Sequence, residues 1–461
     1  RAELGLKKNQ QLVVSRQNFI EMCHVITEMD EVAFKDTFQR LGYSIDWVDE
    51  YATIDDKSRR IAQRSFLDLH AKGHVYQLES PTMWDVDFQT AVAQAEVEDR
   101  EKNGAYHDIE FGVLDDRAVT ESFVVSTTRP ELLAACVGVT AHPDDERYKS
   151  LFGKYAVTPG FFSKIPIFPS AEADPDKGTG ILMVCTFGDQ TDVMWWREQR
   201  LELRQIMARN GRISERSFGG ENGWFSLNPD LANTNYQKIV GKRAPSAKSI
   251  VVDLMRDPEN SAIGKRAPLQ REPEPIRHPV RYYEKGDSPL EYLTTRQWFV
   301  RLLDKTDQLI DMGNKIKWHP EFMRKRFENW TENLNVDWCI SRQRYFGVPI
   351  PVWYPLDSNA EPIYDDVIVA TESMLPVDPE STPPPGYSES QRGVPDGFLG
   401  EPDIFDTWFT SSLSPQVVAR WGEPGDQMRS LFPADIRPQS HEIIRTWAFY
   451  TIAKALLHQD T

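Results

Sequence analysis

An apolar run at Phe123–Glu131 (FVVSTTRPE) ends in three hydroxyl residues followed by an arginine. Aromatic and β-branched residues favour a strand for its first part. A strand commonly exits through Gly, Asn or a single Ser, so a cluster of hydroxyls beside a guanidinium indicates a binding site. Thr127, Thr128 and Arg129 are therefore candidate functional residues.

A second polar cluster follows an apolar strand at Gly178–Asp192 (GTGILMVCTFGDQTD). It ends in Asp189 and Asp192, and their spacing of three would place both carboxylates on one face of a helix. Two structural roles remain open, since Asp189 can cap that helix and Asp192 can complement its dipole. Together with the hydroxyls and the guanidinium, the carboxylates predict a pocket that binds an ammonium group and a hydroxyl and orients a water molecule.

The elements that carry these clusters follow from residue periodicity. Gln17 to Lys72 has helical spacing, interrupted by a turn or short strand at LGYSIDW. From Val119 to Gly264, short β-branched runs separated by Pro, Gly and Asp predict a compact, mostly β domain, with a helix at QTDVMWWREQRLEL. Strands and helices then alternate, which predicts doubly wound α/β, and DPESTPPPGYSESQRGVPDG is expected to form an exposed loop.

Composition limits the class of protein. The chain has 461 residues, of which 40% are hydrophobic and 27% charged, as in globular proteins. No run approaches the roughly 20 apolar residues that span a bilayer, and the first residues contain no apolar signal segment. We expect a cytoplasmic protein with no membrane partner. Because the chain starts on Arg1 and not on Met, we expect it to be an internal piece of a longer protein.

Cysteines and histidines give no strong metal or redox motif. The four cysteines, widely separated and without a CxxC pair, are expected to be buried thiols; they are Cys23, Cys136, Cys185 and Cys339. For Cys185, no base lies nearby in the sequence, so we expect a core residue. His70 and His74 share the i,i+4 spacing of a zinc pair, but a helix terminus is the better interpretation, since no third ligand is near.

The net charge of −17 argues against a nucleic-acid partner, but the charge is unevenly spread. Lys315–Trp330 (KIKWHPEFMRKRFENW) combines five basic residues with four aromatic ones. Such a mixture suits contact with phosphates and stacking on unpaired bases. It equally suits a solvated amphipathic helix, and the sequence alone does not decide between the two.

The motifs TTRPE, AHPDDERY and GTGILMVCTFGDQTD together resemble the editing domain of valyl-tRNA synthetases. Other stretches resemble the class I synthetase core: DWCISRQRYFGVPIPVWY, DIFDTWFTSSLSPQ and ADIRPQSHEIIRTWAFY. The resemblance covers nearly the whole chain. It implies an incomplete α/β core of the Rossmann type, with a mostly β editing domain inserted. The implied boundaries are 1–117 for the first part of the core and connecting segment, 118–275 for the editing domain and 276–461 for the second part of the core.

The resemblance also implies an activity. Such enzymes join valine to tRNA(Val) with ATP and Mg²⁺, and they hydrolyse threonyl-tRNA, because a hydrophobic pocket cannot strongly reject an isostere that merely adds a hydroxyl. The resemblance implies that Asp192 binds the substrate hydroxyl, Asp189 the α-ammonium and Arg129 the terminal adenosine of the tRNA. Thr127 and Thr128 would complete the pocket. An oriented water would attack the ester without a covalent nucleophile.

In the synthetic half, the resemblance implies that Trp408 packs on the amino-acid side chain, with a core Trp as the alternative. It places His441, Glu442, Arg445 and Trp447 along the adenylate pocket. The chain departs from the family pattern at several positions, with Met183 for a Lys, Gly188 for a His and Ala135–Cys136 for an Asp-Thr pair. The stretch PTMWDVDF stands where some members have a Cys-rich knuckle, so no zinc is expected, and no other metal site is predicted.

Two signature motifs are missing from these 461 residues, the His-Ile-Gly-His type and the Lys-Met-Ser-Lys-Ser type. Both stabilise phosphates during amino-acid activation. The chain by itself is therefore expected not to catalyse valine-dependent exchange of pyrophosphate into ATP. Alternatives to a valyl enzyme are an isoleucyl enzyme, a free-standing deacylase of mischarged tRNA, and a non-catalytic tRNA-binding relative. No DNA partner is expected.

Overall fold

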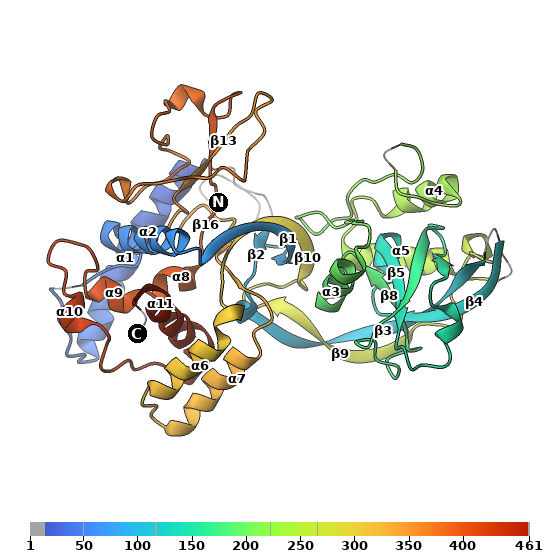
Figure 1. Ribbon diagram of the computed structural model, residues 1–461, viewed down its shortest axis with the longest axis horizontal. Coiled ribbons are helices and arrows are strands. Elements are labelled where there is room, and N and C mark those ends of the chain that lie inside the picture. The colour runs from blue at the N-terminus through green and yellow to red at the C-terminus, as the bar shows by residue number, and fades with distance from the viewer. Residues whose placement is uncertain (1–13, 49, 116–117, 222, 265, 460–461) are drawn as a thin grey trace. The chain divides into compact units, whose positions relative to one another are not determined.

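The computed structural model describes residues 14–459, except 49, 116–117, 222 and 265. The chain divides into two compact units, which are residues 1–78 with 297–461 (unit 1) and residues 79–296 (unit 2). Both boundaries lie inside strands, in β1 (Val75–Asp85) and in β10 (Glu291–Val300) (Figure 1). Unit 2 is thus an insertion that leaves and rejoins unit 1 through extended chain.

The first two helices of unit 1 begin at residues whose side chains cap them. Ser15 accepts a hydrogen bond from the backbone N–H of Asn18 (3.2 Å) at the start of α1, and Asp55 accepts one from Ser58 (2.6 Å) at the start of α2. The helices are α1 (Arg16–Arg40), α2 (Asp56–Ala71), α6 (Thr306–Lys315), α7 (Arg324–Glu332), α8 (Thr407–Ser411), α9 (Ser414–Val418), α10 (Met428–Leu431) and α11 (Phe449–Gln459), the last preceded by a π-helical turn, η10 (Ile444–Ala448). The predicted helical segment with its interruption is confirmed.

Strands of unit 1 are short and pair antiparallel. They are β11 (Trp338–Cys339), β12 (Ser341–Arg342), β13 (Val352–Pro355), β14 (Ile368–Val369), β15 (Phe398–Gly400) and β16 (Ile404–Phe405). β13 lies between β14 and β15, β12 pairs with β16, and the end of β10 pairs with β11. The predicted strands and helices are both present, but they do not alternate, since β11 to β16 follow one another with no α-helix between them and α8 to α11 come afterwards. The strand pairs are also antiparallel, which the order of elements along the chain could not decide.

An aromatic core joins distant segments of unit 1. Phe66 of α2 is fully buried, with its ring centroid 5.3 Å from that of Trp298 and 5.6 Å from that of Phe405. Phe405 stacks in turn on Phe409 at 4.3 Å. This core fixes α2 against the ends of β10 and β16 and against α8, which carries Trp408.

Unit 2 is built on a β-sheet of order β4-β3-β6-β7-β5-β8, with β9 pairing along the other half of β3. Its remaining strands are β2 (Thr90–Ala91), β3 (Val97–Asp115), β4 (Ala118–Thr127), β5 (Cys136–Ala141), β6 (Tyr155–Val157), β7 (Lys164–Pro169), β8 (Ile181–Cys185) and β9 (Glu274–Tyr283), and its helices are α3 (Gln190–Gln199), α4 (Pro229–Ile239) and α5 (Ala244–Met255). β3 and β9 form the long ribbon visible in Figure 1. The predicted β texture with helices is confirmed.

The helix predicted at QTDVMWWREQRLEL is shorter than expected. α3 ends at Gln199, and Arg200 takes a left-handed conformation with φ of 50°. Leu201 then donates back to the carbonyl of Trp196 at 3.0 Å, in the manner of a helix C-cap. Leu201 is thereby directed toward the cluster around Val137 and Phe168, so tertiary packing ends a helix that sequence periodicity would continue.

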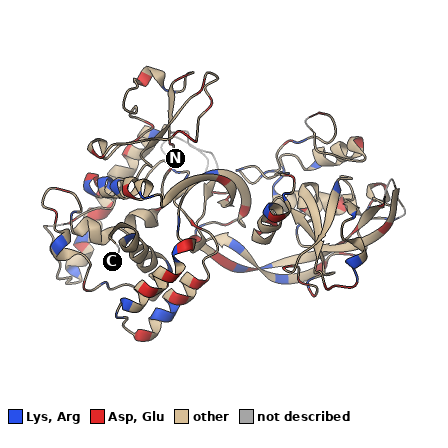
Figure 2. Cartoon of the chain, in the orientation of Figure 1, with Lys and Arg blue, Asp and Glu red and all other residues tan. Residues whose placement is uncertain are grey.

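The basic and aromatic segment Lys315–Trp330 runs from the last residue of α6 through a turn into α7. Phe327 is fully buried and lies 5.7 Å from Trp318 and 5.9 Å from Phe449, between ring centroids. Along α6 and α7 the charged residues of both signs are interspersed (Figure 2). Only Phe322 exposes its ring broadly, at 70%. Three of the four aromatics are therefore held by the protein itself, and this favours the solvated-helix interpretation over base stacking.

The cysteine prediction is confirmed for Cys136, Cys185 and Cys339, which are buried, whereas Cys23 is half-buried; all four are free thiols. His70 ends α2 as predicted. The described residues contain no group of three His, Cys, Asp or Glu side chains that could hold a metal ion. Across the same residues, none of the helices is both long and apolar enough to cross a bilayer. Half of the residues from Asp378 to Gly397 are exposed, so the predicted exposed loop is found in part.

A buried polar chain connects α2 with α11. Lys454 Nζ donates to Ser65 Oγ (2.6 Å), Ser65 contacts His458 Nε2 (2.8 Å), and His458 Nδ1 contacts Asp68 Oδ2 (2.6 Å). A neutral imidazole satisfies every partner, accepting at Nε2 and donating at Nδ1. Burial lowers the pKa of His458 to about 4. The fold therefore selects the uncharged form of this histidine.

We expect unit 1 to lose stability in mild acid through His458. An ordinary histidine has a pKa of about 6.5, so the unfolded chain takes up a proton between pH 6.5 and 4 while the folded chain does not. The contribution of the neutral His458 to the free energy of unfolding is therefore complete above pH 6.5. It falls by up to about 3 kcal/mol as the pH is lowered toward 4. Urea unfolding across this pH range measures it. His458→Gln should flatten the dependence, and the same change at the exposed His319 should leave it intact; a parent with no pH dependence would contradict the expectation.

Candidate functional site

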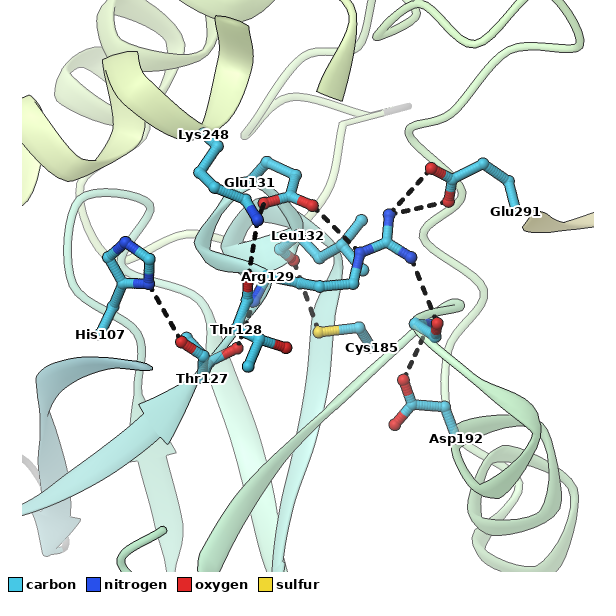
Figure 3. A network of polar contacts seen from close by, with 11 residues as sticks. His107, Thr127, Thr128, Arg129, Glu131, Leu132, Cys185, Asp192, Lys248 and Glu291 are labelled. Atoms are coloured by element: carbon cyan, nitrogen blue, oxygen red, sulfur yellow. Dashed lines mark hydrogen bonds and ion pairs between the residues drawn. The ribbon is translucent and has the colours of Figure 1, made fainter. Parts of the chain in front are cut away.

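The hydroxyl-rich turn lies at the end of β4. Thr127 is the last residue of that strand and pairs with His107 of β3. Its carbonyl is hydrogen-bonded to His107 Nδ1 (3.2 Å), and its hydroxyl accepts from the backbone N–H of Arg129 (3.0 Å) (Figure 3). The carbonyl of Thr128 accepts from Lys248 Nζ of α5 at 2.8 Å. Neighbouring elements thus hold the turn from two directions, through β3 and through α5.

Arg129 contacts three acceptors at once (Figure 3). Its Nε donates to Glu131 Oε1 (3.0 Å), and one terminal nitrogen donates to both carboxylate oxygens of Glu291 (2.8 and 3.0 Å). The other terminal nitrogen donates to the carbonyl of Gly188 (3.2 Å). Burial would lower the pKa of this guanidinium, but the charges of Glu291 and Glu131 outweigh burial and raise it above the usual value. The side chain is a fixed cation, 23% exposed.

The two aspartates lie on different parts of the same helix start. Asp189 is the N-cap of α3, accepting from the backbone N–H groups of Thr191 (2.8 Å) and Asp192 (3.0 Å), as the capping interpretation predicted. Asp192 is buried in the first turn and accepts from the backbone N–H of Gly188 (2.8 Å). Burial, assisted by the charge of Asp189, holds the pKa of Asp192 well above its usual range. The carboxyl group of Asp192 therefore lies in a dry setting that favours its neutral form.

The two predicted clusters meet in space. Arg129 reaches from the turn after β4 to the carbonyl of Gly188, whose own N–H binds Asp192. On the strand side, the backbone N–H of Ser126 donates to Thr179 Oγ1 at 3.3 Å. The arrangement places hydroxyls, a cation and a buried carboxyl around one region. Such a set can orient a small polar substrate and a water molecule.

Sequence reasoning missed four side chains of this network. Glu131 and Glu291 face Arg129, Lys248 binds the turn and lies 3.9 Å from Glu131, and His107 binds it from β3. Only Glu131 had a signal, since it lies two residues after Arg129 in the same motif.

Two departures from the family pattern have a structural setting. A Cβ built on Gly188 would come within 2.7 Å of Asp192 Oδ2, so the absence of a side chain lets Asp192 fold back onto the Gly188 N–H. Ala135 and Cys136 are fully buried in the core below the turn, and Cys136 pairs with Cys185 of β8. Cys185 donates to the carbonyl of Leu132 (3.6 Å) and is buried, in agreement with its predicted core role.

Unit 1 contains a separate cavity of about 200 Å³. Trp408 of α8 and Trp447 of the π-helical turn line it. The further lining residues come from the segment before α2, from α2, α8 and α9, and from the turn before η10: Tyr51, Thr53, Ser58, Thr410, Ser411, Ser414, Val417 and Ile443. Arg437 lies 3.9 Å from the centroid of the Trp447 ring, and burial lowers the pKa of this guanidinium to about 10. Aromatic walls with a few hydroxyls suit a small, mostly apolar ligand.

The other three predicted residues of this half lie outside the cavity. His441, Glu442 and Arg445 are exposed and do not line it. Glu442 accepts a hydrogen bond from Ser440, and its carboxylate lies 3.7 Å from His441 Nδ1. The structure therefore brings two of the five predicted residues, Trp408 and Trp447, into one cavity and leaves the other three at the surface beside it.

Comparison with known proteins places the chain in a family. Residues 2–459 match the model of the tRNA synthetases class I (I, L, M and V). The chain is 49% identical over 457 residues to the valine–tRNA ligase of Thermobifida fusca, covering 98% of this chain and 50% of that protein. It is 50% identical over 451 residues to the valine–tRNA ligase of Salinispora tropica, covering 97% and 50%. The chain spans about half the length of these curated relatives.

Among solved structures, a ternary complex of LeuRS, tRNA and LeuAMS from Agrobacterium radiobacter K84 is similar over 97% of this chain and 56% of that chain. Its sequence identity to this chain is 16% and the TM-score is 0.38, so the likeness is weak. The family model, by contrast, matches almost the full length. The chain belongs to the class I tRNA synthetase family that comprises the isoleucyl, leucyl, methionyl and valyl enzymes.

Proposed function

We propose that this chain is part of a valine–tRNA ligase that also hydrolyses threonyl-tRNA. Similarity to valine–tRNA ligases at 49% and 50% identity supports the ligase, with valine, ATP and tRNA(Val) as substrates. The isoleucyl alternative has less support, because both relatives are valine enzymes. Residues 118–275 would form the editing domain, and residues 1–117 and 276–461 would belong to the synthetic core. We assign the protein to the cytoplasm, where tRNA is charged.

One observation carries the editing proposal, namely the approach of the TTRPE turn to the buried carboxyl of Asp192 through Arg129 and Gly188. Threonine differs from valine by a hydroxyl, and a site with buried polar groups binds that hydroxyl while leaving those groups unpaired against valine, at about 1–3 kcal/mol each. Asp192 would read the hydroxyl and Asp189 the α-ammonium. The hydroxyls of Thr127 and Thr128 would help to orient the attacking water.

If Arg129 holds the terminal adenosine, its guanidinium must either give up some of its present contacts or keep them while it also contacts the adenosine. Its guanidinium already serves Glu131, Glu291 and Gly188, and its remaining exposure is 23%. A planar guanidinium can still stack on a base through its face while its edges are hydrogen-bonded. We therefore propose stacking, and not hydrogen bonding to phosphate, as its contact with the adenosine.

In the synthetic half, Trp408 and Trp447 would enclose the valine side chain, since both line the 200 Å³ cavity. His441, Glu442 and Arg445 would reach the nucleotide from the surface beside it. ATP would enter with Mg²⁺, an ion usually held by one or two carboxylates and the substrate's own phosphates. The described residues offer no ready group of three ligands, and we assign none of them to the ion.

The proposal is tested by incubating the 461-residue chain with pre-formed threonyl-tRNA(Val) and valyl-tRNA(Val) and measuring ester hydrolysis. We expect threonyl-tRNA to be hydrolysed about 10- to 100-fold faster than valyl-tRNA, because valine would leave one or two polar groups of the site unpaired. Spontaneous hydrolysis without protein is the control. Equal rates for both esters would contradict a pocket that reads the hydroxyl, and no hydrolysis of either would contradict the editing assignment.

A further inference from the structure

Glu291 lies outside every motif that signals the site, yet its carboxylate is the closest charged partner of Arg129. Both carboxylate oxygens accept from one terminal nitrogen, at 2.8 and 3.0 Å, and the glutamate side chain is only 8% exposed. It is the first residue of β10, and Leu290 just before it donates its N–H to the carbonyl of Arg281 on β9 (2.9 Å). The start of β10, which is hydrogen-bonded to β9, therefore holds this carboxylate in place.

A continuous path of contacts leads from Glu291 to the carboxyl proposed to read the substrate. Glu291 binds Arg129, Arg129 donates to the carbonyl of Gly188 (3.2 Å), and the N–H of Gly188 donates to Asp192 (2.8 Å) (Figure 3). Each step is a single hydrogen-bonded contact in a largely buried setting. The orientation of the Gly188 peptide, and with it Asp192, thus depends on where the guanidinium is held.

Glu131, the other carboxylate beside Arg129, cannot by itself fix the position of the guanidinium relative to Gly188. Glu131 is two residues away on the same turn and binds only Nε, at 3.0 Å. Its second oxygen is buried without a hydrogen-bond partner, with Lys248 at 3.9 Å. Glu131 therefore moves with the turn, whereas Glu291 belongs to a different strand. Only a partner on a separate element can fix the turn relative to the loop at Gly188.

We propose that Glu291 is a positioning residue for hydrolysis, which fixes Arg129 and thereby links the turn Thr127–Glu131 to the Gly188–Asp192 loop. The inference rests on the proposed editing function and adds a residue to it. Glu291 does not touch the substrate or the water. Its removal should slow the chemical step more than it weakens binding of the tRNA ester, because misplacing a reacting group by about 1 Å costs on the order of 100-fold in rate, whereas stacking of Arg129 on the adenosine is only one of many contacts with the tRNA.

The test compares Glu291→Gln, Glu291→Asp and a matched control in hydrolysis of threonyl-tRNA by the 461-residue chain. Glu291→Gln should lower kcat by about 10-fold or more and raise KM by a clearly smaller factor. Glu291→Asp keeps the charge and should recover part of the loss. The control is Glu110→Gln, because Glu110 is also a buried strand glutamate paired with an arginine, Arg266 at 2.7 Å. Thermal unfolding of each variant verifies folding.

A double substitution tests whether Glu291 acts through Arg129. If it does, Glu291→Gln added to Arg129→Met should cause no further loss of kcat, whereas independent roles would multiply the two losses. Full kcat in Glu291→Gln, an equal loss in Glu110→Gln, or multiplied losses in the double variant would each overturn the inference and leave the editing function standing. A parent chain that does not hydrolyse threonyl-tRNA would instead overturn the proposed function, and this inference with it.

Discussion

Replacing Asp192 with alanine is expected to slow hydrolysis of threonyl-tRNA by about 100-fold, the scale of removing one well-placed polar group from an active site. Asp192 is buried, its pKa is raised by burial and by Asp189, and its present partner is the Gly188 N–H. Alanine removes both the proposed acceptor for the threonine hydroxyl and the hydrogen bond from the Gly188 N–H. The measurement is single-turnover release of threonine from pre-formed ester.

Two controls separate these effects. Asp192→Asn keeps an oxygen that can accept from the Gly188 N–H, so the loop should stay ordered while the ionisable group is lost. Asp230 is also an acidic residue in the first turn of a unit 2 helix, α4, but is exposed; Asp230→Ala should leave hydrolysis within about 2-fold, since it removes only a favourable charge near a helix dipole. A rate in Asp192→Ala equal to that of the parent would show that this carboxyl does not take part.

Replacing Phe66 with alanine is expected to lower the free energy of unfolding of unit 1 by about 3–5 kcal/mol. The ring is fully buried and contacts Trp298 and Phe405 at centroid distances of 5.3 and 5.6 Å. Because α2, β10 and β16 come from distant parts of the chain, the cavity left behind lies where they join and cannot be closed by one segment alone. Urea unfolding followed by near-ultraviolet circular dichroism measures the change.

The matched control for the core is Phe322, which exposes 70% of its side chain in the same unit. Phe322→Ala should change the free energy of unfolding by no more than about 0.5 kcal/mol, as is usual for surface positions. A loss below about 1 kcal/mol for Phe66→Ala would mean that the aromatic cluster is not the core that joins these segments. Hydrolysis of threonyl-tRNA should survive in Phe322→Ala, because unit 2 carries the site.

Local chemistry predicted the elements that hold the candidate site. The β-branched run before Thr127 ends as a strand there, and Asp189 caps α3, as its position before a helical run indicated. These outcomes depend on contacts within a few residues, which the sequence displays directly. The family also followed from the sequence, because several long motifs agree with one another and the match covers residues 2–459.

Pairing between distant segments could not be predicted in the same way. Strand order and the antiparallel pairs of unit 1 depend on which apolar faces meet, and a given set of strands along the chain is compatible with several pairings. The exposure of His441, Glu442 and Arg445 could not be predicted from the sequence either. Their spacing placed them on one segment, but only the packing of the turn before α11 decided which side chains face the cavity.

By itself, the sequence determined which residue types the site contains, because the hydroxyls, the guanidinium and the two carboxylates occupy two short stretches. Only the tertiary structure decided how they are joined, since Arg129 pairs with Glu291, 162 positions away, and Lys248 binds Thr128, 120 positions away. The reason is physical. A buried charge must find its partner wherever strand register and helix packing bring one within about 3 Å, and neither is visible in the spacing of residues along the chain.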